Sequence, residues 1–411
     1  MPDREPVSLG KGTSVPKRLI LCFDGMWDKP PDPGAPPQPS HDFDRCPTPL
    51  SRPDSLPATN VLKLYHSILP QTHNGHLQQK WYDSGRETPW FRRFRDGAFG
   101  YGLDQTILQG YAYLIAAYEP GDDLFIYGFS RGAYVARSLV GLLSTAGILS
   151  TTLLNPDSIR RVRKTAMPGN SVAPSHDLAQ DLTDMVLDPS NHSIDEAYRL
   201  YRNFHNDAHT SASAAFRRRA TQHVTVTVLG IWDTVGPLGI PTNALRWLNE
   251  HRYNFHDTEL SPIVKQAYQA LAIDEHRADH NATLWTSPPR SGQKIEQRWF
   301  TGAHGDVGGT YQDRDLADCV LAWMQQRSIL EGLAVETSRF LLKPNALGPI
   351  HDSFSECFGG FRKWFHSRFY RPVMQTGTGT EVLDDSVHTR LLHNLRYRPH
   401  NEGLKSVLRF G

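Results

Sequence analysis

The sequence has few cysteines, almost no net charge and no long apolar run. Of its 411 residues 4 are cysteines, and none of them forms a Cys-x-x-Cys pair. A zinc site is therefore not indicated, and so few cysteines in a long chain fit a reducing compartment. The 44 Lys and Arg residues are balanced by 43 Asp and Glu residues, which leaves a formal charge of +1. This balance argues against a dedicated nucleic-acid-binding protein, because such proteins usually carry a basic face.

Membrane-spanning and targeting segments are not visible in the sequence either. No apolar stretch approaches the roughly 20 residues of a membrane-spanning helix, and residues 1–17 lack the apolar centre of a signal peptide. We therefore expect a soluble protein that is cytoplasmic as synthesised, which leaves export by a non-classical route open. Hydrophobic residues make up 39% of the chain and are spread along it, so a sizeable core can form.

The most informative motif is Gly-x-Ser-x-Gly at residues 128–132, with Ser130 at its centre. Residues 123–127 before it form an apolar stretch typical of a strand, and residues 133–143 after it carry apolar side chains at helical spacing. A strand, a sharp turn and a helix are the context in which this motif holds a nucleophilic serine. The amide of Arg131, at the start of the helix, would then point to the oxyanion of a reacting ester. The alternative interpretation is an ordinary tight turn.

Strand-like and helix-like segments alternate along much of the chain. This alternation predicts an α/β-hydrolase-like fold with a mostly parallel, doubly wound sheet. The predicted strands are residues 18–23, 79–82, 123–127, 224–232 and 295–300. The predicted helices are residues 60–69, 104–118, 133–143, 261–274 and 316–326.

The domain prediction has three parts: a flexible tail at residues 1–16, a catalytic domain at 17–340 and a C-terminal segment at 341–411. Within the catalytic domain, residues 29–58 are rich in proline and predict a long surface loop, and residues 150–222 predict a helical cap insertion. The C-terminal segment is aromatic, basic and loop-rich, and we expect it to pack on the catalytic domain as an appendage.

A serine nucleophile needs a base and an acid that orients the base. In this fold class they follow on loops after strands, in the order Ser, acid, His. Asp233, directly after the strand 224–232, is the predicted acid, and a capping aspartate is the alternative interpretation of this residue. His304 follows the strand 295–300 in a glycine-rich loop and is the predicted base. Asp306 is the main alternative acid, and His388 is the main alternative base.

The oxyanion hole needs a second amide, which we expect from the loop after the strand 18–23. Gly25 permits a close approach of the backbone, so the amide of Gly25 or Met26 is the predicted donor. We expect Asp24 to bond loop amides and to shape the hole, since a negative charge beside an oxyanion is unfavourable. A metal site built on Asp24 and neighbouring carboxylates is a weak alternative, and we expect neither a metal nor another cofactor.

Two segments combine aromatic and basic residues. Residues 90–101 are consistent either with an apolar substrate groove, with cations for an anionic head group, or with a loop packed on the core. Residues 354–370 resemble an interfacial segment that contacts a membrane surface, although packing of the C-terminal region is the simpler interpretation.

Taken together, these segments resemble the catalytic domain of the type VI secretion phospholipase effectors, a group of α/β-hydrolases long catalogued as a domain of unknown function. The resemblance spans about residues 17–330. It is carried by residues 23–28 with 59–61, 82–85 with Thr88, 128–133 and 299–309, and is supported by 233–236 and 272–277. Many members have threonine where this chain has Met26, and the proline-rich residues 29–58 are not part of the motif set.

The resemblance implies hydrolysis of lipid esters, with Ser130 as nucleophile, His304 as base and Asp233 as acid. We therefore predict a serine hydrolase that cleaves carboxylic esters of phospholipids or other apolar acyl compounds through an acyl-enzyme. The expected partner is a small-molecule or lipid ester, with peripheral membrane contact and no nucleic acid. The alternatives are an esterase, lactonase or thioesterase for a small soluble substrate, and a binding protein that keeps the fold without catalysis.

Overall fold

The structure, a computed structural model, describes residues 16–25, 58–85, 101–166, 176–203, 207–235, 259–357 and 367–407. Its centre is a sheet of seven strands in the order β2-β1-β3-β6-β7-β8-β9, in which all neighbouring strands are parallel. The strands are β1 (Arg18–Phe23), β2 (Gln78–Asp83), β3 (Asp123–Phe129), β6 (Val226–Trp232), β7 (Val264–Ala272), β8 (Lys294–Phe300) and β9 (Glu381–Leu383). The predicted parallel α/β architecture is confirmed.

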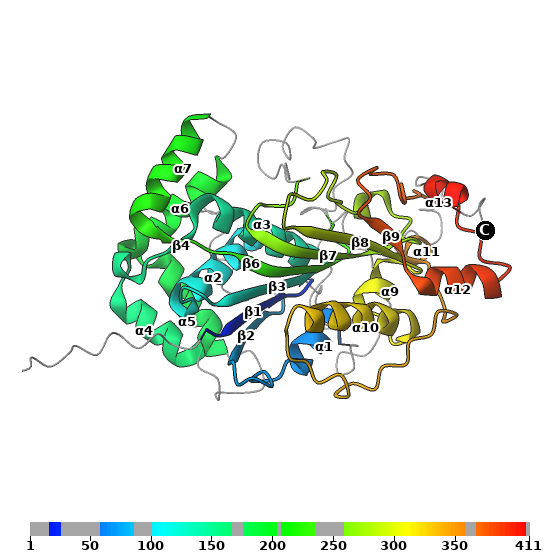
Figure 1. The fold of residues 1–411 in the computed structure, drawn as a ribbon, viewed down its shortest axis with the longest axis horizontal. Coiled ribbons are helices and arrows are strands. Elements are labelled where there is room, and N and C mark those ends of the chain that lie inside the picture. The colour runs from blue at the N-terminus through cyan, green and yellow to red at the C-terminus, as the bar shows by residue number, and fades with distance from the viewer. Residues whose placement is uncertain are drawn as a thin grey trace, which may run out of the picture.

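Helices cover both faces of this sheet (Figure 1). Between the strands of the sheet, and after them, the chain forms α1 (Asn60–Ser67), α2 (Tyr101–Ala117), α3 (Arg131–Ala146), α9 (His304–Gly308), α10 (Asp315–Leu330), α11 (Ser353–Cys357), α12 (Asp385–His393) and α13 (Glu402–Val407). The region between α3 and β6 adds α4 (Pro156–Ala166), α5 (His176–Leu187), α6 (His192–Arg202), α7 (Asp207–Ala220) and the short antiparallel pair β4 (Ile148–Leu149) and β5 (Thr221–Gln222).

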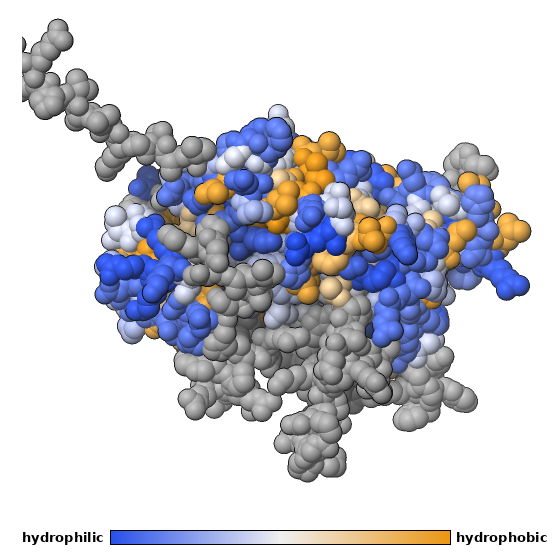
Figure 2. Space-filling model, turned by 90° about the horizontal axis from the view of Figure 1, so that it is seen from below, coloured by the Kyte–Doolittle hydropathy of each residue, from blue (hydrophilic) through white to orange (hydrophobic). Residues whose placement is uncertain are grey.

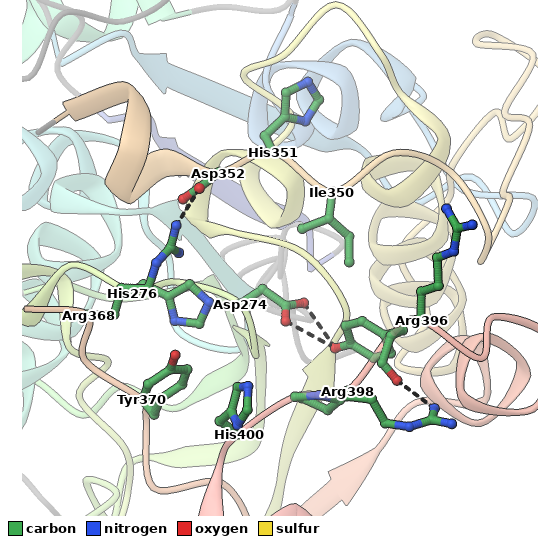
Figure 3. A pocket seen from close by; sticks show the side chains of 12 residues that line it. Asp274, His276, Ile350, His351, Asp352, Arg368, Tyr370, Arg396, Arg398 and His400 are labelled. Atoms are coloured by element: carbon green, nitrogen blue, oxygen red, sulfur yellow. Dashed lines mark hydrogen bonds and ion pairs between the residues drawn. The ribbon is translucent and has the colours of Figure 1, made fainter. Parts of the chain in front are cut away.

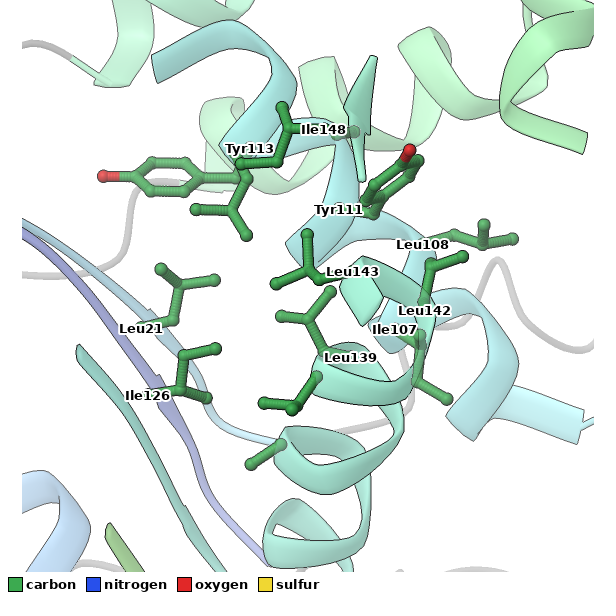
Figure 4. Packing of buried hydrophobic residues seen from close by; sticks show 14 of the residues in the cluster. Leu21, Ile107, Leu108, Tyr111, Tyr113, Ile126, Leu139, Leu142, Leu143 and Ile148 are labelled. Carbon is green, nitrogen blue, oxygen red and sulfur yellow. The ribbon is translucent and has the colours of Figure 1, made fainter. Parts of the chain in front are cut away.

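Alternate residues of the buried strands pack on opposite faces. On β1, Leu21 faces the helices α2 and α3, where Leu139 and Leu143 belong to the same apolar cluster (Figure 4). Its neighbours Ile20 and Cys22 face the other way and join the cluster of α1 and α10. Successive side chains of a strand point to opposite faces, so a strand covered on both sides must be apolar throughout. This explains the uninterrupted apolar run at 19–23.

The helices of the region 150–222 form an outer layer on one face of the sheet. The helices α4 and α5 pack against α2, while α6 and α7 pack against α3. In Figure 1 they gather at the left of the molecule, beyond α2. These four helices therefore pack on α2 and α3, which themselves cover the sheet.

The predicted helix at 261–274 is wrong. These residues form the strand β7 between β6 and β8, and residues 267–273 are buried. Alanine, leucine, lysine and glutamine favour a helix in isolation. Here the two neighbouring strands offer a continuous ladder of hydrogen bonds, and buried apolar clusters cover both faces of β7. This tertiary context overrides the local preference.

The C-terminal segment contributes to the sheet itself. Strand β9 pairs with β8, and Leu383, Val387 and Leu404 pack in one cluster with Leu271 and Trp299 of the sheet. Residues beyond 340 therefore extend the sheet and its core, and do not merely rest on its surface.

On the face seen in Figure 2, the coloured surface is largely hydrophilic, with separate apolar patches. Large apolar side chains with high exposure include Leu330 and Leu341, which border a cavity of about 600 Å³ between α10 and residues 337–344. Within the described ranges, no helix has both the length and the apolar character needed to cross a membrane.

Candidate active site

The candidate residues lie at the carboxyl edge of the sheet, where parallel strands end side by side. Gly25 follows β1, Ser130 follows β3, Asp233 follows β6 and His304 follows β8. The chain leaves β1 towards β2 on one side, and β3 lies on the other side of β1. Ligand sites of open α/β sheets form at such a reversal of strand order, because the loops there diverge and leave a crevice.

Ser130 occupies the sharp turn between β3 and α3. Its φ is 57° and its ψ is −120°, a left-handed conformation that non-glycine residues rarely adopt. The flanking glycines allow the surrounding backbone to come close. A Cβ atom on Gly128 would lie 2.4 Å from the carbonyl oxygen of Gly132, and one on Gly132 would lie 2.2 Å from that of Phe23. The Gly-x-Ser-x-Gly spacing is therefore a packing requirement of this turn.

His304 begins α9 and joins Ser130 to Asp233. Its Nε2 lies 2.9 Å from Ser130 Oγ, and its Nδ1 lies 2.6 Å from Asp233 Oδ2. An ionised carboxylate can only accept, so Nδ1 carries the proton, and in the neutral ring Nε2 accepts from the serine hydroxyl. The imidazole stacks on the ring of Phe129 with ring centroids 4.8 Å apart. The Phe129 ring fills the space that a side chain at Gly308 would need.

Asp233 is fully buried and accepts hydrogen bonds at both oxygens. Oδ1 accepts from the amide of Ala272 at 3.1 Å and from Arg371 Nη1 at 2.6 Å. Oδ2 accepts from His304 and from Arg371 Nη2 at 3.0 Å. Burial by itself disfavours the carboxylate, but Arg371 and His304 bring the pKa of Asp233 down to about 2. The side chain is therefore ionised at neutral pH.

His304 is held neutral by its surroundings. Burial lowers the pKa of this imidazole, although the hydrogen bond and the charge of Asp233 act in the opposite direction. Its backbone amide donates to Glu275 Oε2 at 3.2 Å, and Arg277 and Ser353 hold that carboxylate. His304 is thus held by hydrogen bonds of its backbone amide and of both its ring nitrogens.

The loop after β1 lies beside the serine. A Cβ atom on Gly25 would sit 3.4 Å from Ser130 Cβ, in van der Waals contact with the serine. The Gly25 amide donates to Asp24 Oδ1 at 2.8 Å, while Thr59 and Tyr82 donate to Asp24 Oδ2. Burial raises the pKa of Asp24 to about 6. Met26, the other expected donor, lies outside the described residues.

The alternative candidates occupy other positions. Asp306 accepts from the amide of Ala303 and lies 2.6 Å from Nδ1 of His351, so its hydrogen bonds go to the start of α9 and to the C-terminal segment. His388 is an exposed residue of α12. Among the residues that the structure describes, no group of three or more His, Cys, Asp or Glu side chains could hold a metal ion.

A cavity of about 320 Å³ lies between residues that follow β7 and residues of the C-terminal segment (Figure 3). Asp274 and His276, which follow β7, form one wall, and Tyr397 donates to Asp274 across it. Arg368 on the rim is paired with Asp352. The residues that line the cavity do not include Ser130, Asp233 or His304.

The aromatic segments fall mostly outside the described ranges. Residues 90–100 and 358–366 lie outside these ranges, and for Tyr101 only the backbone is described. Of the predicted interfacial residues, Phe354 is buried and Tyr370 is 39% exposed. Sequence reasoning missed Arg371, because nothing in the spacing of a basic, aromatic segment relates it to Asp233.

The parallel sheet and the residues at its carboxyl edge define an α/β protein of the hydrolase-like class. The chain belongs to the family described as the catalytic domain of T6SS Tle1-like phospholipase effectors, which matches residues 17–327.

Three further proteins are similar to this chain. An uncharacterized protein of Saccharomyces cerevisiae is 24% identical over 303 residues, which are 67% of this chain and 34% of that protein. The chain therefore spans about a third of the length of this curated relative. A structure of an uncharacterized protein from Pseudomonas aeruginosa has a TM-score of 0.35 at 15% identity and covers 78% of this chain and 46% of that one. The Tle1 effector bound to the VgrG spike from the type 6 secretion system has a TM-score of 0.33 at 15% identity, over 76% and 56%.

Proposed function

We propose that this protein is a serine hydrolase that cleaves carboxylic esters of phospholipids or related apolar acyl compounds. The observation that carries the proposal is the unbroken path of hydrogen bonds from Ser130 through His304 to Asp233. A nucleophile within hydrogen-bond reach of a base, which a third group orients, is the arrangement that activates a hydroxyl. The phospholipase family to which the chain belongs supports the lipid substrate.

In the first half of the reaction Ser130 Oγ attacks the carbonyl carbon of the ester. Its proton moves to His304 Nε2, and the imidazolium that forms keeps its Nδ1 proton on the bond to Asp233. The tetrahedral intermediate then collapses, the bond to the leaving alcohol breaks, and His304 returns the proton to that alcohol. The acyl group remains as an ester on Ser130.

In the second half a water molecule takes the place of the alcohol. His304 accepts a proton from the water as the water attacks the acyl carbon, and the proton passes to Ser130 Oγ when the acyl bond breaks. The products are a carboxylic acid and the free enzyme. No cofactor takes part in these steps.

The oxyanion in both halves needs amide donors. The amide of Arg131, the first residue of α3, is one, because the start of a helix presents N–H groups. The Gly25 amide already donates to Asp24, so we expect the second donor to be Met26.

The nucleophile is tested with a fluorophosphonate probe, which reacts covalently with activated serines. We expect labelling of the wild type and of Ser144→Ala, a control on the helix α3 that follows Ser130, and none of Ser130→Ala. Unchanged labelling of a folded Ser130→Ala variant, or an unlabelled wild type, would contradict the proposal.

The substrate class is tested by comparing phosphatidylcholine vesicles with p-nitrophenyl butyrate. Fatty acid release from the vesicles supports a lipase, and activity on the soluble ester alone supports the esterase alternative.

A further inference from the structure

Arg371 is a buried arginine of the C-terminal segment, outside the residues 17–327 that the family match covers. It lies in the stretch between α11 and β9, and its side chain has no exposed surface. Arginine is rarely buried to this degree unless it is paired. Its partners therefore indicate why the chain places it there.

The guanidinium joins the ends of two strands. It binds Asp233 with both terminal nitrogens, at 2.6 and 3.0 Å, and these two parallel bonds form the fork geometry that arginine makes with a carboxylate. It also donates to the carbonyl of Ala272, at the end of β7, at 2.8 Å, and to the carbonyl of His280. The carbonyl of Arg371 itself accepts from Asn401 at 3.0 Å. Its position is thus fixed at both ends.

The pairing with Arg371 compensates the buried negative charge of Asp233. Asp233 is fully buried and the histidine beside it is neutral before the reaction, so the carboxylate would otherwise be an uncompensated buried charge. Arg371 neutralises it. Arg371 and the amide of Ala272 also occupy the other acceptor positions of Asp233. The one position left, on Oδ2, faces His304 and accepts the hydrogen bond from Nδ1.

We propose that Arg371 is a positioning residue of the hydrolase site, which keeps Asp233 ionised and turned towards His304. The inference rests on the proposed function, in which Asp233 orients the base. It assigns the C-terminal segment a part in the site: the segment completes the hydrogen bonds of a residue that lies inside the family domain.

A lysine cannot replace this arginine fully. Its ammonium is a point charge and cannot form two parallel bonds to one carboxylate. Arg371→Lys therefore retains the charge and loses the fork, whereas Arg371→Ala loses both. The two variants separate electrostatic compensation from orientation.

The pH dependence of labelling supplies a readout that a purely structural role would not move. Labelling needs a neutral His304, so its rate falls as the pH drops through the pKa of this ring. The positive charge of Arg371 disfavours the imidazolium, so removal of this charge should raise the pKa of the His304–Asp233 pair. The fall of the labelling rate on the acid side of the pH profile, the acid limb, should then move to higher pH. The charged or titratable groups that face this pair in the described structure are His280, Arg277, Glu275 and Arg371.

The experiment measures the second-order rate of fluorophosphonate labelling against pH for full-length variants whose folding is checked by circular dichroism. For Arg371→Ala we expect a rate about 100-fold lower, since displaced catalytic groups cost on this order, an upward shift of the acid limb, and partial recovery with added guanidinium ion. For Arg371→Lys we expect a lower rate with the limb unmoved. Arg390→Ala is the control: this buried arginine binds the carbonyls of Ala346 and Gly348, so its loss should destabilise the fold without moving the limb.

A folded Arg371→Ala variant with the wild-type rate and limb would overturn the inference, even if Ser130→Ala is inert as proposed. If Arg371→Ala does not fold, Arg371→Lys decides, because a wild-type rate would then show that the fork is not needed. Labelling that survives in Ser130→Ala would refute the proposed function itself. The two failures are therefore distinguishable.

Discussion

The substitution Asp233→Asn tests the candidate site most directly, because every partner of this carboxylate is a donor. Oδ1 accepts from Ala272 and Arg371, and Oδ2 accepts from His304 and Arg371. Asparagine keeps the shape but turns one acceptor into an NH₂ group. The group meets Ala272 and Arg371 in one orientation of the amide, where two hydrogen bonds are lost, and His304 and Arg371 in the other, where at least the bond from Arg371 is lost.

The magnitude of the effect follows from charge and tautomer. Arg371 would be left as a buried charge without its counter-ion, and breaking a buried pair in this way costs about 3–5 kcal/mol of folding stability. If the NH₂ group faces His304, Nδ1 becomes an acceptor and Nε2 carries the proton, so the ring can no longer accept from Ser130. Loss of the correct tautomer in a triad lowers the rate by about 10⁴-fold.

Two measurements check this reasoning. Thermal unfolding should show a clear fall in Tm, and the rate of fluorophosphonate labelling should fall by roughly 10³–10⁴-fold at a temperature where the variant is folded. Asp306→Asn is the matched control: that carboxylate bonds Ala303 and His351, so the variant should lose stability but keep most of its labelling rate. A folded Asp233→Asn variant that is labelled like the wild type, or an inert Asp306→Asn variant, would refute the assignment of the acid.

Two further predictions concern the turn and the pH profile. Gly132→Ala should lower the free energy of unfolding, measured in urea, by about 3 kcal/mol or more and abolish labelling, because its Cβ would meet the backbone oxygens of Phe23 and Asp24 at 2.2 and 2.6 Å. Gly141→Ala on the same helix is the control. Its Cβ would meet only the ring of Tyr201, so the loss of stability should be much smaller. The labelling rate of the wild type should fall on the acid side with a midpoint below the ordinary histidine value of 6.5, because burial lowers the pKa of His304; a midpoint above 6.5 would show that the ring is not held neutral.

Much of the fold could be predicted because its signals are local. The strands at 18–23 and 123–127 are short apolar runs, and the helix at 104–118 has a long apolar pattern; all of them appear in the structure with small shifts at their ends. The segment 261–274 was mistaken for a helix because its composition favours one. Its strand conformation depends on β6 and β8, which are distant in sequence.

The candidate site divides in the same way. Ser130, Asp233 and His304 each follow a predicted strand, so a parallel sheet brings them to one edge, and their chain order matches the fold class. The choice between Asp233 and Asp306 could not be made from spacing. Asp306 is nearer to His304 in sequence, yet its side chain turns to His351.

The sequence by itself determined the strand–turn–helix around Ser130, because the glycines at 128 and 132 and the apolar flanks specify that turn locally. It also determined the parallel α/β class, since alternating strands and helices can bury their apolar faces in few other ways. Only the tertiary structure decided which carboxylate contacts His304 and that Arg371, 138 residues away from Asp233, neutralises it. A buried charge selects its partner by distance in space, and that distance has no signature in the spacing of residues along the chain.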